Sequence, residues 1–145
     1  MKENRIKGVI RSVDETVVDI AKREISLPVA DRFAAIGKRL AEGIAQLASA
    51  TRWIVENAEA RPLEIAAGAV AYLKLSGYVM GGWMMARAAL IAERQLDAGG
   101  DAGFYRAKIA TARFYVEHIL PQYSALADTV TGGAASVLAL EESQF

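Results

Sequence analysis

Residues 75–92 read LSGYVMGGWMMARAALIA, and no side chain from Leu75 to Ala86 carries a charge. A helix needs about 20 apolar residues to cross a bilayer, and Lys74 and Arg87 bracket a shorter run. We therefore expect no membrane span. The stretch should instead lie inside a helical core or face a partner protein.

The apolar stretch belongs to a long helix that we expect over about residues 62–97. Pro62 suits a first helical position, and the residue before a proline resists the helical conformation. At the other end, Asp97 is followed by Ala98, Gly99 and Gly100, and glycine adopts the left-handed conformation that closes many helices. Both ends of this helix are therefore marked in the sequence.

A second long helix is expected before it, starting at Asp31 after the break at Pro28 and ending near Arg61. Its apolar residues recur every seven positions and fill the three-four spacing of one buried helix face. The members of this face are Phe33, Ile36, Leu40, Ile44, Leu47, Ile54 and Ala58.

A third long helix should follow Asp101, whose carboxylate can cap its first turn. Pro121 removes one backbone hydrogen bond, so we expect a kink near residues 117–121, and Gly132-Gly133 should end the helix. Its buried stripe is predicted to be Tyr105, Ile109, Ala112, Val116, Ile119, Tyr123, Leu126 and Val130.

These elements predict an all-α fold, an antiparallel helical bundle of three long helices with a short N-terminal helix and a C-terminal tail. The short helix is expected at about residues 12–24, where Ser12 and Glu15 have the spacing of a capping box. This helix or the tail would close a fourth side. We assign residues 1–27 to a connecting arm and residues 28–145 to the bundle domain, of the usual single-domain size.

Composition excludes several classes of function. The 17 basic and 17 acidic residues balance, so no net field gathers phosphates, and nucleic acid is not expected as a partner. The chain has no cysteine, which fits a cytoplasmic location, and we expect no export signal. His118 is the single histidine, and it lacks the Glu-x-x-His pairing of di-iron bundles and a serine-triad context. We predict no catalytic and no metal-binding residues.

An unusual group of aromatic and methionine side chains lies within the opening stretch. Tyr78, Met80, Trp83, Met84 and Met85 point around the whole helix, so one neighbouring helix cannot cover them all. Either the bundle centre buries them or a second protein surface does. Our candidate interaction surface consists of Tyr78, Trp83, Met84, Met85 and Phe145.

Two glycines within the same stretch have a spacing of their own. Gly77 and Gly81 are four residues apart, the spacing that lets two helix backbones approach closely. We expect tight packing against a neighbouring helix at both positions.

The chain from about Ala66 to the end resembles the additional C-terminal domain of a group of bacterial acyl-CoA dehydrogenases, the group that includes 3-methylmercaptopropionyl-CoA dehydrogenase. The likeness is carried by AGAVAYLKLSGYVMGGWMMARAA and by GDAGFYRAKIATARFYVEHILPQYSALADTVTGGAASVLALEESQF. The segment FYRAKIATARFYVEHILP is its most specific part, and residues 1–60 are similar only loosely.

The resemblance implies a parent flavoprotein in which a glutamate takes the α proton of an acyl-CoA and FAD accepts the β hydride. It implies no catalytic residue in this chain, because none of Glu56, Glu59, Glu93, Glu117, Glu141 and Glu142 matches the family's base. The implied cofactor, FAD, would be bound by the parent enzyme, and the implied partners are the dehydrogenase core of the same polypeptide and a second subunit.

Two alternatives from other classes remain beside this interpretation. One is a stand-alone helical module that binds a protein or a membrane surface, and it follows from the apolar stretch. The other, with less in its favour, is a metal-containing bundle enzyme.

Overall fold

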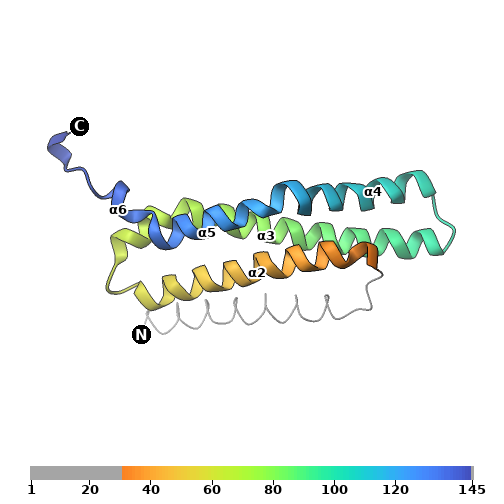
Figure 1. Ribbon diagram of the computed structural model, residues 1–145, viewed down its shortest axis with the longest axis horizontal. Helices are drawn as coiled ribbons and strands as arrows, with labels where there is room; N and C mark the ends of the chain where they lie inside the picture. Colours follow the sequence, from red (N-terminus) through yellow and green to blue (C-terminus); the bar gives the residue numbers. More distant parts are fainter. Residues whose placement is uncertain (1–30, 145) are drawn as a thin grey trace, which may run out of the picture.

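The structure is a computed structural model that describes residues 31–144. Within that range it contains helices and no strand, in the order α2 (Asp31–Asn57), α3 (Pro62–Asp97), α4 (Ala102–Phe114), α5 (Tyr123–Gly132) and α6 (Ala134–Val137). Figure 1 shows α2, α3 and an arm made of α4 and α5 lying side by side. The predicted all-α bundle with three long arms is confirmed, whereas the connecting arm and its short helix fall outside the described residues.

Both ends of α3 lie where the sequence places them. The helix begins at Pro62, and Gly99 closes it with a φ of 82°, a left-handed conformation that favours glycine. The next helix is capped as predicted, because Asp101 Oδ1 accepts hydrogen bonds from the amides of Gly103 at 2.9 Å and Phe104 at 3.1 Å. The left-handed conformation of Gly99 and the hydrogen bonds of Asp101 therefore determine the turn between these two helices.

The core lies along the axis of the bundle, where the inward faces of the three arms meet. From α2 it receives the predicted stripe, but Ile54 is only half-buried and Ala58 lies past the helix end and is exposed. The other arms supply the largest fully buried side chains, which are Leu75, Val79, Val116, Leu120 and Val130.

A π turn at Tyr115–Ile119 and a 3-10 turn at Leu120–Gln122 separate α4 from α5. Pro121 causes this interruption, because its ring would clash with the carbonyl four residues earlier in a regular helix. The amide of Leu120 instead donates to the carbonyl of Tyr115, five residues back. A kink was expected near residues 117–121, and the structure shows a change of helix type there. The bend itself stays a prediction.

The π turn also corrects the predicted buried stripe of this arm. Its five-residue hydrogen bond takes up one residue more than an α turn, and Leu120 takes the inward position at this turn. Leu120 and Ala127 are buried in place of Ile119 and Leu126, which are half-buried. The predicted positions Tyr105 and Ile109 are half-buried as well, and the rest of the predicted stripe is buried, at Ala112, Val116, Tyr123 and Val130.

Close helix packing occurs at glycines, but in a different pattern from the predicted one. A Cβ on Gly68 would lie 3.1 Å from the carbonyl oxygen of Val130 and 3.3 Å from its Cα, so α3 and α5 meet backbone to backbone. Gly81 makes room for the side chain of Tyr115, whereas a Cβ on Gly77 would meet nothing within 4 Å. The expectation of tight packing is wrong for Gly77.

The C-terminal tail leaves the bundle instead of closing a fourth side. Ala134 in α6 is buried, and the residues beyond Val137 extend away from the helices (Figure 1). The apolar side chains of Val137, Leu138 and Leu140 are 64%, 46% and 53% exposed. Of the two predicted ways to close a fourth side, the described part of the tail does not provide one, and the short helix lies outside the described residues.

Gly68→Ala should lower the free energy of unfolding by about 1–3 kcal/mol, because an added methyl group meets backbone atoms that move only if α5 moves. The matched control is Gly37→Ala in α2, where a Cβ would meet nothing within 4 Å. That change should raise the free energy of unfolding by about 0.5–1 kcal/mol. Urea unfolding followed by circular dichroism measures both, and equal effects would contradict the backbone contact.

Candidate interaction surface

The predicted surface residues differ in how exposed they are, and their role as an interaction surface stays a prediction. Tyr78, Trp83 and Met85 are half-buried, and Trp83 and Met85 pack against the hydrophobic core. Met84, in contrast, is 54% exposed. Phe145 lies outside the described residues, so its contribution stays a prediction.

Trp83 lies at the edge of the core with an incomplete set of polar partners. Its indole Nε1 is buried and meets no hydrogen-bond acceptor within residues 31–144, which costs about 1–3 kcal/mol for a buried donor. The guanidinium carbon of Arg87 lies 4.9 Å from the ring centroid, within the range of a cation–π contact. Trp83 therefore contacts the core on one side and the exposed residue Arg87 on the other.

Tyr78 is held by the α4–α5 arm. The hydroxyl of Tyr115 donates a hydrogen bond to the backbone carbonyl of Tyr78 at 3.1 Å, and the absence of a side chain on Gly81 makes room for it. Burial, and to a smaller extent the charge of Tyr78, raises the pKa of Tyr115 above its ordinary value. This contact packs the α4–α5 arm against the backbone of α3, and the side chain of Tyr78 is half-buried.

The exposed apolar surface lies on the opposite side of α3 from the core. Its residues follow two seven-residue series, and we call this surface the outer stripe. One series is Ala66, Leu73, Met80 and Arg87, and the other is Val70, Gly77, Met84 and Ile91. Leu73 is 72% exposed and Val70 is 65% exposed, values that are unusual for large apolar side chains arranged in a continuous row.

Met84 is the one residue of the outer stripe that was also predicted from the sequence as part of the candidate interaction surface. The seven-residue spacing was visible in the sequence, but α3 is apolar on every side, so its inward and outward rows could not be told apart. Burial separates them, because Leu75 and Val79 point into the core while Leu73 and Met80 do not.

The apolar character of α3 also raises the question of a membrane. Over its most apolar 18-residue window α3 has a mean hydropathy of 1.2, and 17% of that window is buried, so length and composition alone would allow it to span. A single helix of this kind is weak evidence, because core helices of water-soluble bundles pass the same test. Here α3 has one face in the core and one face exposed.

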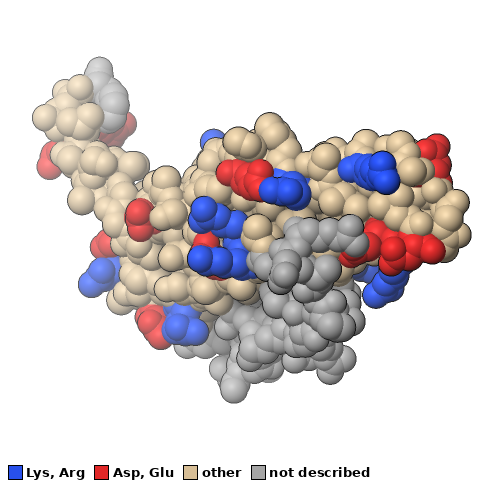
Figure 2. All heavy atoms as spheres, turned by 45° about the vertical axis from the view of Figure 1, so that its right-hand side comes forward, with Lys and Arg blue, Asp and Glu red and all other residues tan. Residues whose placement is uncertain are grey.

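Charged side chains of both signs are mixed on the face shown in Figure 2, and no large field of one sign is visible there. The described residues contain no group of three or more histidine, cysteine or acidic side chains that could hold a metal ion. His118 is exposed and lies beside Phe114, with ring centroids 4.8 Å apart. The arrangement offers an apolar surface and no metal-binding geometry.

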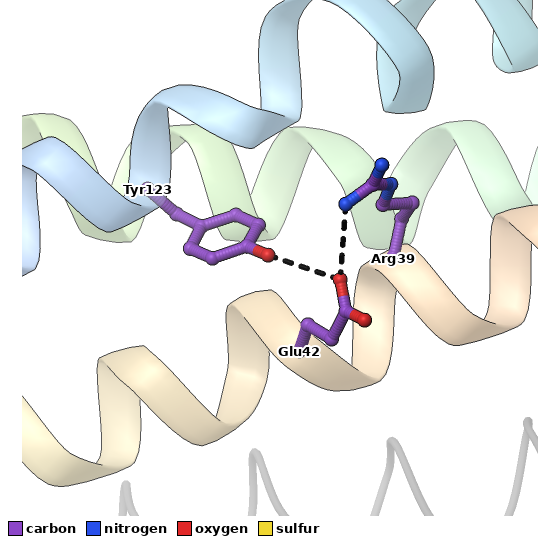
Figure 3. Close-up of polar contacts among 3 residues, drawn as sticks. All are labelled: Arg39, Glu42 and Tyr123. Atoms are coloured by element: carbon purple, nitrogen blue, oxygen red, sulfur yellow. Dashed lines mark hydrogen bonds and ion pairs between the residues drawn. The ribbon is translucent and has the colours of Figure 1, made fainter.

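One polar cluster connects α2 to the α4–α5 arm. Figure 3 shows the hydroxyl of Tyr123 pointing at Glu42, to which it donates a hydrogen bond at 3.1 Å, and Arg39 pairing with the same carboxylate at 3.3 Å. Burial raises the pKa of Tyr123, and the hydrogen bond to Glu42 adds to this. The carboxylate of Glu42 accepts from two donors, and its hydrogen bond with Tyr123 connects α2 to α5.

Residues 31–144 do not fit a flavin. A flavin nucleotide needs several donors for its diphosphate and ring, and the buried donors of the described range include the indole Nε1 of Trp83 and the hydroxyl of Thr51. The Thr51 hydroxyl already donates to the carbonyl of Leu47 and lies 2.8 Å from the hydroxyl of Tyr72. We assign no step of flavin chemistry to these residues.

A model of the protein family described as "Acetyl-CoA dehydrogenase C-terminal like" matches residues 9–141. The chain belongs to this family. The match confirms the resemblance found in the sequence and extends it toward the N-terminus, into residues where the likeness had been loose.

Two curated proteins are similar to this member of the family. 3-Methylmercaptopropionyl-CoA dehydrogenase of Ruegeria pomeroyi is 38% identical over 103 residues, which cover 71% of this chain and 18% of that protein. Broad-specificity linear acyl-CoA dehydrogenase FadE5 of Mycobacterium tuberculosis is 28% identical over 85 residues, which cover 57% of this chain and 14% of that protein. The chain thus spans less than a fifth of either relative.

The Tyr123 contact predicts a loss of stability in alkali. Because the folded-state pKa of Tyr123 is raised above 10.0, the neutral phenol favours folding below that pH, and this contribution is lost as the pH rises from 10.0 through the folded-state pKa. Tyr123→Phe should lower the free energy of unfolding by about 1 kcal/mol at neutral pH. Above pH 10.0 the free energy of unfolding of this variant should fall less than that of the parent.

Urea unfolding at neutral pH and above pH 10.0 measures this difference. Tyr105→Phe on the half-exposed side of α4 is the matched control, and it should leave the alkaline decline unchanged. A Tyr123→Phe variant that declines as steeply as the parent would contradict the assignment.

Proposed function

We propose that the chain acts as a non-catalytic C-terminal domain of a cytoplasmic, FAD-dependent acyl-CoA dehydrogenase. The observation that carries this proposal is the family match over residues 9–141, together with two relatives that are both acyl-CoA dehydrogenases several times longer than the chain. In such an enzyme the flavin supplies the hydride acceptor, and the dehydrogenase core would bind it.

The domain would serve the enzyme through its surface. Its described residues offer a rigid bundle with one long apolar row on α3, including Leu73, Met80 and Met84 at 72%, 44% and 54% exposure. Contiguous exposed apolar surface of this extent is typical of protein interfaces. We therefore infer that the domain packs on the dehydrogenase core, holds two subunits together, or shapes the entrance for acyl-CoA.

The purified 145-residue chain should carry no flavin and should not reduce an electron acceptor when acyl-CoA is added. Visible absorbance of the pure protein and an acceptor assay with short and long acyl-CoA substrates test this. A yellow preparation with stoichiometric flavin would contradict the proposal. The genomic reading frame upstream of Met1 gives a second test, because a stop codon there would contradict a shared polypeptide.

A stand-alone membrane-surface module is the second candidate, favoured by the small buried share of the apolar window of α3. Co-sedimentation with vesicles of neutral lipid, and with vesicles containing anionic lipid, separates the two candidates. A domain of a dehydrogenase should stay in the supernatant with both, whereas binding that is lost in Met84→Glu would favour the membrane surface.

A further inference from the structure

Three exposed basic side chains border or join the outer stripe of α3. Residues three or four positions apart are neighbours on a helix surface, so Lys74 lies beside Gly77 and Arg94 lies beside Ile91. Arg87 is itself a member of the stripe, and all three basic side chains are exposed. Positive charge therefore accompanies the apolar row from its middle to its C-terminal end.

The acidic residues of α3 lie on the side of the helix that faces the core. Glu93 follows the buried Leu75 by 18 residues, about five turns of 3.6 residues each, so both lie on the same row. Asp97 follows the buried Val79 by the same interval. Glu64 continues the buried row toward the N-terminus. Within α3, which the structure describes in full, no acidic residue is a neighbour of the outer stripe.

The apolar row has an opening at its middle. A Cβ on Gly77 would meet nothing within 4 Å, and the neighbouring side chains of Leu73 and Met80 are 72% and 44% exposed. Glycine in a helix interior is unfavourable relative to alanine. A gap of this kind between larger side chains can receive a side chain of a facing helix, as a knob enters a hole.

Charge distinguishes between the possible occupants of the outer stripe. A second copy would bring further basic side chains and no acidic one, and like charges beside an apolar seam are unfavourable. Segments that bind anionic lipid carry clusters of about 4–8 lysines and arginines, whereas α3 has three spread over residues 74–94, and the chain balances 17 basic with 17 acidic residues. An apolar helix with acidic edges complements both the row and its charges.

We propose that the outer stripe of α3 receives an amphipathic helix with acidic residues along the edges of its apolar face. This inference rests on the proposed role of the domain as a packing surface, and it names the chemistry of the segment that packs there. The helix would come from the part of the parent enzyme outside this chain. At about 1.5 Å per residue the row from Ala66 to Ile91 is roughly 38 Å long, so a single straight helix covers it.

In this arrangement the apolar face of the partner helix covers Leu73, Met80 and Met84. One of its side chains enters the gap at Gly77, and the two methionines adapt to the rest of its surface because they are flexible. Carboxylates at its edges pair with the bordering basic side chains, which sets the orientation of the helix more than its affinity.

The first test uses two designed helical peptides of about 26 residues, the length of the row. Both have the same leucines and alanines on one face, and they carry either glutamate or lysine at the bordering positions. The full 145-residue chain should bind the glutamate peptide at least about 10-fold more tightly, since edge pairs of opposite charge add up along the row. Fluorescence anisotropy of the labelled peptides measures this preference, and added salt should reduce it.

Charge reversal in the chain is the second test. Lys74→Glu combined with Arg94→Glu should reverse the preference, so that the lysine peptide binds more tightly. The matched control is Lys38→Glu combined with Arg106→Glu, which changes the net charge equally at exposed positions of α2 and α4 and should keep the preference. Met84→Glu should weaken the binding of both peptides about 100-fold, because it places a charge inside the apolar contact. Circular dichroism checks that each variant is folded.

Several results would overturn the inference. Equal binding of the two peptides, no binding of either, or a control variant that also reverses the preference would each do so. A dimer of the chain that Met84→Glu disrupts would show that a second copy occupies the stripe. Vesicles of phosphatidylcholine with phosphatidylglycerol that displace the glutamate peptide would show that lipid does. Bound flavin in the same preparations would contradict the proposed function alone and would leave the peptide result standing.

Discussion

A helix of 36 residues that is apolar on every side imposes the central constraint on this structure. Its neighbours α2, α4 and α5 cover one side of α3, where Leu75 and Val79 are almost completely buried. Helix packing in a small bundle covers only part of each helix circumference. The apolar residues on the remaining side of α3 stay exposed to water until another surface covers them. The helices therefore pack into a bundle that leaves part of its apolar surface exposed.

Much of the architecture was predictable because its signals are local. Pro62 and Gly99 define the ends of α3 through the conformations they allow, and Asp101 caps the next helix with its own side chain. The shift of burial from Ile119 to Leu120 was not predictable from periodicity. It depends on how the chain resolves the clash of Pro121, and a kink or a π turn would each relieve that clash.

Which side of α3 is exposed could not be predicted from the sequence, for a different physical reason. Periodicity identifies a face when the opposite face is polar, and α3 provides no such contrast. Trp83 and Met85 therefore looked equivalent to Met84, although the structure packs the first two against the core and leaves the third exposed. Only the positions of the neighbouring helices separate a core row from a surface row.

The tail has a further consequence for how the sequence can change over time. Within residues 31–144, Ala134 is the last buried residue, and the side chains of Val137, Leu138 and Leu140 are 64%, 46% and 53% exposed. Substitutions there escape the packing demands that restrict Leu120 or Val130. Selection on the tail can then follow a contact outside the bundle, independently of the stability of the domain that carries it.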